Sequence, residues 1–250
     1  SELAKIGIIL FLAAYISSKS REMRQWKKMV IPFLFAIPII VIVGIENLST
    51  CIILLAISFI MIFVATPLWV PFVVIGLIGV AGAGGLLLTQ GYRMERITVW
   101  LDPAASEKGH QTIQGLYAIG SGGLFGKGLG QSMQKLGFLP EANNDMIFSV
   151  ICEELGLFGA LCVLALFFAL IWRFMVIAVN APDLYGSMIV VGVIAHIGIQ
   201  VFINIAVATN TIPNTGIPLP FISYGGSSLV FMLLEMGLVL SVSRYINVKK

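Results

Sequence analysis

The chain has 250 residues, of which 58% are hydrophobic and 11% are charged, and its formal net charge is +3. A soluble domain carries about 25% charged and 45–50% apolar residues, so this composition excludes an ordinary soluble domain. The apolar residues form long blocks without period-two alternation, which excludes a membrane β-barrel and predicts an all-α, polytopic bundle of transmembrane helices.

Seven apolar blocks follow one another along the chain and are expected to cross the membrane as helices. The first opens directly after Ser1 without a basic segment or a cleavage site, so it is not a signal peptide. We expect a single membrane domain over residues 1–250 that is N-terminally truncated from a longer protein. The blocks occupy residues 3–17, 30–45, 50–66, 69–89, 155–179, 185–208 and 226–243.

The distribution of Lys and Arg predicts how these helices are oriented. The loop at residues 17–28 carries five basic residues, and the loop after Arg173 and the C-terminal tail fall on the same side of the membrane. Short loops rich in Lys and Arg face the cytoplasm. We therefore expect a cytoplasmic C-terminus and an extracellular loop at residues 90–154. A loop of this length is usually functional, and its interleaved apolar residues predict that it is ordered.

Residues 120–130, "GSGGLFGKGLG", form a glycine-rich run inside this loop. The run is not a P-loop, because Gly128 follows Lys127 where Ser or Thr is required, and it lacks GxGxxG spacing after a strand. The glycines are interpreted as positions of tight turns and close helix packing. The alternative is that their backbone amides bind an anionic headgroup.

The stretch "LPEANNDMIF", residues 139–148, places an acid close to a following apolar helix. Asp145 could cap the start of that helix, a role that Asn143 or Asn144 could fill equally well. Alternatively, Asp145 could be a general base, because desolvation beside apolar residues raises the pKa of a carboxyl group. Residue chemistry alone leaves both interpretations open.

Other charged residues near Asp145 also have two interpretations. Glu153 and Glu154 are expected at the start of a helix, where they would interact favourably with its dipole. The cations of the long loop could reach out to lipid headgroups, or they could together bind a diphosphate. These cations are Arg93, Arg96, Lys127 and Lys135.

Polar residues also occur inside the predicted spans. His196, Gln200 and Asn204 are spaced four apart and form a polar stripe on one helix face. Glu235 lies near the middle of the last span, and ionisable groups inside membranes are usually paired. We expect Glu235 to meet the stripe, either for hydrogen bonding between helices or as part of a lipid or proton path.

The three cysteines are Cys51, Cys152 and Cys162. Their count is odd and their spacing matches no metal-binding motif, so we interpret them as packing residues rather than disulfide partners. No set of protein side chains is predicted to form a metal site.

Several motifs together resemble those of the SEDS family (shape, elongation, division and sporulation), the RodA/FtsW-type proteins. The resemblance rests on "QTIQGLYAIGSGGLFGKGLGQSMQKLGFLPEANNDMIFSVICEELGLFG" at residues 111–159, and on "NTGIPLPFISYGGSSL" at residues 214–229, followed by "SRY". "SELAK" at the start and "YRMERITVWLDP" at residues 92–103 are similar to further elements of the family. The matches extend over the whole chain in the family's order.

The resemblance implies a peptidoglycan glycosyltransferase of the bacterial cytoplasmic membrane with ten spans, seven of them in this chain. Such a protein polymerises lipid II, usually together with a class B penicillin-binding protein that acts as a transpeptidase. Its partners would be lipid II, that transpeptidase and membrane lipids, with no nucleic acid.

The resemblance also implies roles for individual residues. The essential aspartate of the family corresponds to Asp145 in "NDMIF", and the family's Glu–Lys pair corresponds to Glu2 and Lys5, which could form an ion pair. A family aspartate is replaced here by Asn47 in "IENLST", so its role is in doubt in this chain. The residues expected to bind substrate are Glu2, Lys5, Arg93, Arg96, Gln111, Lys135 and Glu141.

The implied reaction joins a sugar on undecaprenyl diphosphate to a hydroxyl of a second lipid-linked disaccharide, with inversion. Direct displacement requires a base at the acceptor hydroxyl and positive charge at the departing diphosphate. Asp145 is the expected base. Arg93, Arg96 and Lys135, or a divalent cation (Mg²⁺ or Mn²⁺), are expected to neutralise the leaving group.

Two other functions would fit parts of the sequence. A lipid II flippase would use the polar stripe, Glu235 and the Gly- and Pro-containing spans. A scaffold that recruits the transpeptidase would not need Asp145. The position of the essential residues discriminates among the three functions.

Overall fold

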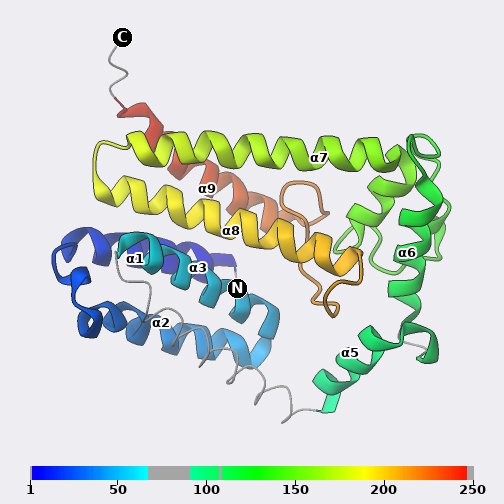
Figure 1. The fold of residues 1–250 in the computed structure, drawn as a ribbon, viewed down its shortest axis with the longest axis horizontal. Helices are drawn as coiled ribbons and strands as arrows, with labels where there is room; N and C mark the ends of the chain where they lie inside the picture. The colour runs from blue at the N-terminus through cyan, green and yellow to red at the C-terminus, as the bar shows by residue number, and fades with distance from the viewer. Residues whose placement is uncertain (1, 67–90, 107–108, 247–250) are drawn as a thin grey trace. The chain divides into compact units, whose positions relative to one another are not determined.

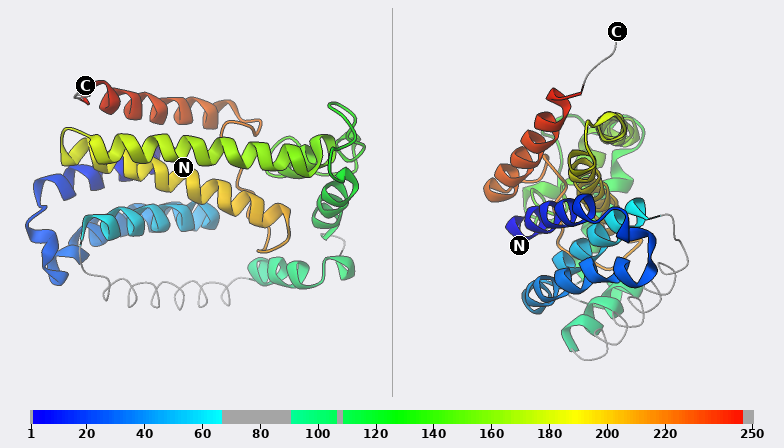
Figure 2. Two further views of the ribbon diagram at one scale, coloured as in Figure 1. Left: turned by 45° about the horizontal axis from the view of Figure 1, so that its top comes forward. Right: turned by 90° about the vertical axis from the view of Figure 1, so that its left-hand side faces the viewer.

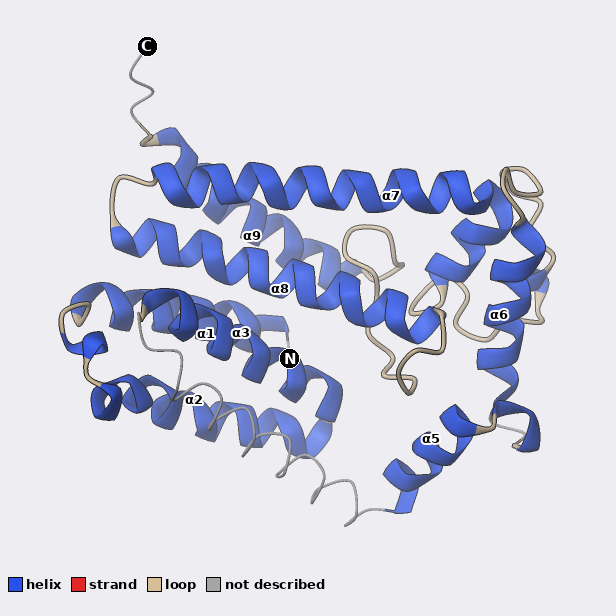
Figure 3. Ribbon diagram, viewed as in Figure 1, coloured by secondary structure: helices blue, strands red, loops and turns tan. Residues whose placement is uncertain are grey.

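The computed structural model describes residues 2–66, 91–106 and 109–246, and every regular element in them is helical (Figures 1 and 3). This confirms the predicted all-α class. Five of these helices contain segments long and apolar enough to cross a membrane, namely Lys28–Glu46, Leu48–Ala65, Ile147–Asn180, Leu184–Ala208 and Gly226–Arg244. The span expected at residues 69–89 lies outside the described residues.

The chain divides into two compact units, which we describe separately. The first unit comprises residues 1–78, 169–199 and 226–250, and the second comprises residues 79–168 and 200–225. The first contains α1 (Glu2–Ser18), α2 (Trp26–Glu46), α3 (Leu48–Ala65), α9 (Gly226–Arg244) and parts of α7 (Ile147–Asn180) and α8 (Leu184–Ala208).

The core of the first unit is a close packing of branched and flexible apolar side chains. Leu12, Ile57 and Met61 are completely buried. A Cβ atom at Gly192 in α8 would lie 2.6 Å from Cγ2 of Ile9 and 3.0 Å from Sδ of Met61, so only glycine permits this approach to α1 and α3. Small residues at such contacts are typical of helices that pack inside membranes.

Asn47, which replaces a family aspartate, acts as a helix cap. Its Oδ1 accepts a hydrogen bond from the backbone N–H of Thr50 at 3.0 Å, at the first turn of α3. Asparagine and aspartate are both favoured at this position. Asn47 therefore caps α3 without a charge.

The second unit contains most of the long loop predicted at residues 90–154. Its described elements are α5 (Gly91–Leu101), the short helical turns η2 (Pro103–Ala105) and η4 (Gln134–Leu136), α6 (His110–Gly122), and the adjoining parts of α7 and α8. Helix α6 (Figures 1 and 2) lies beside the first part of α7: a Cβ atom at Gly115 would lie 3.3 Å from Oγ of Ser149, and one at Gly122 would lie 1.9 Å from the carbonyl oxygen of Cys152. This unit holds the residues predicted to be catalytic.

Helix α7 starts earlier than the apolar block at residues 155–179 predicted. It begins at Ile147 and is broken at Gly156, whose φ of 69° and ψ of −166° are not helical. Glycine adopts this conformation without the steric cost that a Cβ atom imposes. The first part of α7 therefore carries residues that the sequence pattern had assigned to the loop.

The glycine-rich run is joined to α7 at this break. In an uninterrupted helix, the N–H groups of Leu157 and Phe158 would donate to the carbonyls of Glu153 and Glu154. Instead, Leu157 and Phe158 donate to the carbonyls of Gly123 and Leu124. The two freed glutamate carbonyls accept bonds from the N–H groups of Lys127 and Gly128.

The same join explains why glycine recurs in the run. A Cβ atom at Gly122 would lie 1.9 Å from the carbonyl oxygen of Cys152, and one at Gly126 would lie 2.1 Å from that of Glu154. Four glycines of the run have positive φ, namely Gly123, Gly126, Gly128 and Gly130. The interpretation as tight turns and close packing is confirmed.

Candidate active site

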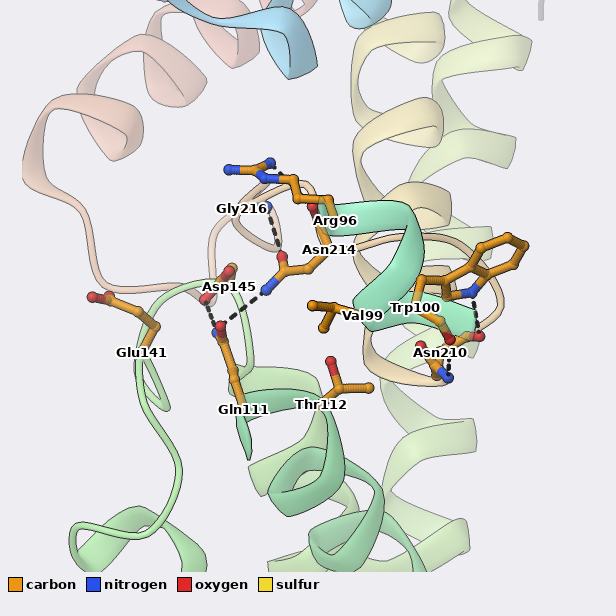
Figure 4. Close-up of a pocket in the computed structure, with 10 residues that line it drawn as sticks. All are labelled: Arg96, Val99, Trp100, Gln111, Thr112, Glu141, Asp145, Asn210, Asn214 and Gly216. Carbon is orange, nitrogen blue, oxygen red and sulfur yellow. Dashed lines mark hydrogen bonds between the residues drawn. The ribbon is translucent and has the colours of Figure 1, made fainter. Parts of the chain in front are cut away.

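A cavity of about 420 Å³ in the second unit gathers polar residues from several segments (Figure 4). Helix α5, helix α6, the turn before α7 and the loop after α8 all contribute to its wall. Its lining residues are Arg96, Val99, Trp100, Gln111, Thr112, Glu141, Asp145, Asn210, Asn214 and Gly216. Four of the predicted site residues therefore lie in one pocket: Asp145, Arg96, Gln111 and Glu141.

Asp145 is the buried carboxylate of this pocket, with 7% of its surface exposed. Burial raises the pKa of its carboxyl group to about 6, because the charged form loses hydration, and the charge of Glu141 adds to the increase. A hydrogen bond from Gln111 and the charge of Arg96 act in the opposite direction. Near neutral pH, Asp145 is therefore largely ionised but is a stronger base than an ordinary aspartate.

A short chain of amides orients the Asp145 carboxylate. Nε2 of Gln111 donates to Oδ1 of Asp145 at 3.4 Å, and Oε1 of Gln111 accepts from Nδ2 of Asn214 at 3.0 Å. Oδ1 of Asn214 in turn accepts from the backbone N–H of Gly216 at 3.0 Å, and Figure 4 draws these bonds as dashed lines. The hydrogen-bond partners of Gln111 and Asn214 therefore determine which end of each side-chain amide is the oxygen and which is the nitrogen.

Arg96 is attached to the same loop. Its Nη1 donates to the backbone carbonyl of Asn214 at 3.1 Å, and its side chain is exposed at the pocket. One turn later in α5, Nε1 of Trp100 donates to the carbonyl of Asn210 at 2.9 Å. These two bonds link α5 to the loop after α8 and keep a guanidinium group beside the carboxylate pocket.

Three consecutive carbonyl groups of the backbone before α7 accept hydrogen bonds from other segments. The carbonyl of Asn143 accepts from the N–H of Tyr224 at 2.8 Å, and that of Asn144 accepts from Oγ of Ser223 at 2.6 Å. The carbonyl of Asp145 accepts from Nδ2 of Asn204 at 2.7 Å. All three donors belong to the end of α8 or the loop after it, so that segment determines where Asp145 lies.

Glu141 has an unusual backbone conformation at the edge of the pocket. Its φ is 54°, in the left-handed region that non-glycine residues rarely occupy. The carbonyl of Glu141 accepts from the N–H groups of Asn144 and Met146, which closes the turn that carries Asp145. The conformation costs roughly 1–2 kcal/mol and is maintained by this turn.

The capping interpretation of the Asn143–Asp145 segment is wrong. Helix α7 begins at Ile147 and its first hydrogen bonds go to the carbonyl of Met146, so Met146 occupies the cap position. The side-chain amide of Asn144 donates to Glu141, and the carboxylate of Asp145 accepts from Gln111. Asp145 faces the pocket rather than the helix end.

The dipole interpretation of Glu153 and Glu154 is also wrong. Both lie at the end of the first part of α7, just before the break at Gly156, and not at a helix start. Glu153 pairs with Lys127 at 2.6 Å, and Glu154 pairs with Lys135 at 2.7 Å. These charges attach the glycine-rich run and the η4 turn after it to α7, and neither lysine is among the residues that line the pocket.

The remaining predicted site residues are distributed as follows. Arg93 belongs to α5, but its side chain lies outside the described part of the chain. Glu2 and Lys5 form the expected ion pair at 2.8 Å in the first unit, with the lysine side chain only 3% exposed. The structure therefore confirms their pairing, while their role in binding substrate stays a prediction.

The expected partner of Glu235 is His196. Nδ1 of His196 lies 2.9 Å from both carboxylate oxygens of Glu235, and both side chains are almost fully buried in the first unit. In the second unit, Gln200 donates to the carbonyl of Pro218, and Asn204 donates to those of Asp145 and Ile217. The stripe therefore forms hydrogen bonds between segments, as the first of the two interpretations predicts.

Sequence reasoning missed the residues that the loop after α8 contributes. Asn210, Asn214 and Gly216 line the pocket, and Ser223 holds the backbone beside Asp145. The motif "NTGIPLPFISYGG" at residues 214–226 was the available signal for Asn214, Gly216 and Ser223, because a cluster of polar residues in an otherwise apolar chain indicates a site. Its place next to Asp145 could not be inferred without the fold.

The fold and the site define a multi-pass α-helical membrane protein with a buried carboxylate in a polar pocket. A family model named FTSW_RODA_SPOVE and described as "Cell cycle protein" matches residues 1–248. The chain belongs to this family, the one that its motifs resemble.

Individual relatives agree with this family. Stage V sporulation protein E of Bacillus subtilis is 47% identical over 251 residues, which covers 98% of this chain and 68% of that protein. A Geobacter metallireducens protein named "Probable peptidoglycan glycosyltransferase FtsW" is 36% identical over 249 residues, covering 97% and 66% respectively. The chain spans about two thirds of the length of these relatives.

Solved structures show the same fold. A chain from a study of the structural coordination of polymerization and crosslinking by a peptidoglycan synthase complex is 27% identical, with a TM-score of 0.79. The match covers 99% of this chain and 70% of that one. The rod shape determining protein RodA of Thermus thermophilus is also 27% identical, with a TM-score of 0.62 and coverage of 98% and 65%.

Proposed function

We propose that this protein is a peptidoglycan glycosyltransferase that polymerises lipid II, with Asp145 as its general base. The observation that carries the proposal is a buried carboxylate with a pKa of about 6 in a polar cavity that also contains Arg96. The names of its relatives support the reaction class. A base of this kind is suited to removing a proton from a sugar hydroxyl near neutral pH.

The proposed reaction is a direct displacement at an anomeric carbon. The Asp145 carboxylate takes the proton of the acceptor hydroxyl while that oxygen forms a bond to the anomeric carbon of the donor sugar. The bond from this carbon to the diphosphate oxygen breaks, and the diphosphate departs with the electron pair. Because the acceptor attacks opposite the leaving group, the configuration inverts, as in inverting glycosidases.

Positive charge is needed where the diphosphate departs. Arg96 is the described cation of the pocket, and its guanidinium can bind two phosphate oxygens at once. Lys135 and Lys127 are paired with glutamates, so we assign them to the loop rather than to the leaving group. Arg93 stays a prediction for this role.

A divalent cation would fit the same pocket. Mg²⁺ is often held by one or two carboxylates together with substrate phosphates, and Glu141 supplies such a carboxylate beside the proposed base. No cluster of three or more His, Cys, Asp or Glu residues occurs in the described parts of the chain. Such an ion would therefore depend on the substrate, and it would supply charge to the diphosphate when bound.

We further propose that the protein acts with a penicillin-binding protein that cross-links the new strands. The similar chain from a peptidoglycan synthase complex supports this partner class. The pocket would open on the outer face of the cytoplasmic membrane, where both lipid-linked substrates can present their sugars.

The test is polymerisation of purified lipid II by the full-length protein with its transpeptidase partner. Asp145→Asn preserves the shape of the side chain and removes the base, so glycan strands should fall by at least about 100-fold. Thr209→Ala is a matched control in the same unit, because its hydroxyl bonds to the carbonyls of Ile205 and Ala206 and to the hydroxyl of Thr211, none of which lines the pocket. Adding EDTA tests the divalent cation in the same assay.

The variant must also be shown to be folded. Because burial disfavours the charged form of Asp145, the neutral Asn variant should melt no lower than the wild type at pH 7. Full activity of a folded Asp145→Asn protein would refute the base. Undiminished glycan synthesis in EDTA would remove the cation from the proposal.

A further inference from the structure

Residues 123–138, which we call the glycine loop, expose several large apolar side chains. Phe125 is 80% exposed, Leu129 is 77% exposed and Leu136 is 73% exposed. The others that are more than half exposed are Leu124, Met133 and Phe138. Exposed apolar clusters of this kind mark contact surfaces rather than solvated loops.

The charges of the glycine loop are paired with charges of α7. Lys127 and Lys135 are its two charged residues, and both pair with glutamates of α7. Glu153 is fully buried and also accepts a hydrogen bond from Oγ of Ser132. The loop has therefore paired both of its charges with α7, while most of its large apolar side chains have no cover within the described chain.

The loop is also held firmly to α7. Four backbone hydrogen bonds join it to the helix at the Gly156 break, and they occupy the groups that the break frees. Leu124 and Phe125 consequently lie beside the residues of α7 that follow the break at Gly156. Leu157, Phe158 and Leu161 are each more than half exposed, so the apolar surface continues from the loop onto α7.

The position of the break along α7 indicates what covers this surface. The part of α7 from residue 157 to residue 180 rises about 36 Å at 1.5 Å per residue, slightly more than the ~30 Å hydrocarbon core. The break thus falls near one boundary of the hydrocarbon core. Exposed apolar residues on α7 beyond the break face lipid, and the glycine loop continues that surface at the level of the headgroups.

We propose that the glycine loop is a membrane-contacting element that inserts Phe125, Leu129 and Leu136 into the boundary between acyl chains and headgroups. The occupant of its apolar surface is the lipid bilayer at the N-terminal end of α7. Interfacial elements bind the membrane through the apolar area that they bury at the boundary of headgroups and acyl chains, and binding strengthens with that area. The inference goes beyond glycosyltransferase activity and does not depend on it.

The insertion can be measured by spin labelling. The full-length protein, with its native cysteines replaced, carries a nitroxide at Phe125→Cys, Leu129→Cys or Leu136→Cys in phosphatidylcholine–phosphatidylglycerol vesicles. Collision with oxygen reports the bilayer, and collision with a water-soluble nickel chelate reports solvent. Leu161→Cys on α7 is the lipid-facing reference, and Gln131→Cys is the matched control on an exposed polar residue of the same loop.

We expect the oxygen-to-nickel accessibility ratio at residues 125, 129 and 136 to exceed that at residue 131 by about fivefold or more, approaching that of residue 161. A ratio equal to that of residue 131 would place the loop in water and overturn the proposal. Exclusion of both reagents would show that protein covers the surface, which would equally overturn it. Three separate positions ensure that one misfolded variant does not decide the result.

Discussion

Asp145 owes its chemical character to its neighbours. Its carboxylate is nearly buried, and Gln111 supplies the side-chain hydrogen bond that orients it. The negative charge of Glu141 and the positive charge of Arg96 then act on it in opposite directions. A base that must be ionised near neutral pH, yet still accept a proton, benefits from this balance.

The balance predicts the pH dependence of polymerisation. Since the carboxylate must be ionised to accept a proton, kcat/KM should fall about tenfold per pH unit below the pKa of about 6 of Asp145. Glu141→Gln removes a neighbouring negative charge, so the midpoint should move to lower pH. Arg96→Gln removes a positive charge, so the midpoint should move to higher pH.

These shifts separate electrostatics from general damage to the pocket. Rates of lipid II polymerisation between pH 5 and pH 8 provide the midpoints, and the two variants should bracket the wild type. A midpoint unchanged in both variants, or displaced in the same direction, would show that these charges do not control the titrating group.

At the scale of elements, the end of α8 and the loop after it determine the position of the turn that carries Asp145. Asn204 is fully buried and bonds the carbonyls of both Asp145 and Ile217. Ser223 accepts from the N–H of Leu219 and donates to the carbonyl of Asn144. Asn204 in α8 and Ser223 in the loop after α8 thus both bind the backbone of the turn that carries Asp145.

Asn204→Ala should therefore lower kcat with little effect on KM. The substitution leaves two buried carbonyls without a donor, which costs about 1–3 kcal/mol each, and it releases the backbone of Asp145. Small displacements of a catalytic group can reduce rates about 100-fold. The measurement is steady-state polymerisation of lipid II by the purified full-length protein.

Gln200→Ala is the matched control for this experiment. Gln200 lies one turn earlier on the same helix face and donates to the carbonyl of Pro218, not to the turn that carries Asp145. Its loss should reduce kcat much less than the loss of Asn204. Equal effects of the two variants on kcat would indicate that the stripe only stabilises the loop.

At the scale of the whole chain, the distribution of basic residues predicts orientation. The loop that contains Lys19 should face the cytoplasm, and the loop that contains Thr211 should face the outside, together with the mouth of the pocket. Lys19→Cys and Thr211→Cys, each in a background without other cysteines, place one thiol in each exposed loop. A membrane-impermeant maleimide added to intact cells should label only residue 211.

Labelling of residue 19 should require permeabilised cells. The reverse pattern would place the pocket in the cytoplasm, where the proposed polymerisation of surface glycans could not occur. Because labelling reports orientation alone, its result is independent of whether Asp145 is a base.

Much of this protein could be predicted from its sequence, because the membrane restricts what an apolar chain can form. Backbone groups in hydrocarbon must be hydrogen-bonded within their own segment, so apolar blocks of sufficient length become helices. The Glu2–Lys5 pair and the meeting of His196 with Glu235 were also predictable. Residues three or four apart share a helix face, and isolated charges in membranes require partners.

Only the tertiary structure decided the roles of residues that depend on contacts distant in sequence. Residue chemistry alone left Asp145 open between a cap and a base, whereas the fold places Met146 at the cap position and Asp145 in a pocket. Likewise, the apolar pattern could not reveal the break at Gly156, which allows Glu153 and Glu154 to bind the glycine loop. Local sequence patterns specify helices. The burial of a carboxylate depends instead on segments that meet only in the folded chain, and burial determines the pKa of that carboxylate.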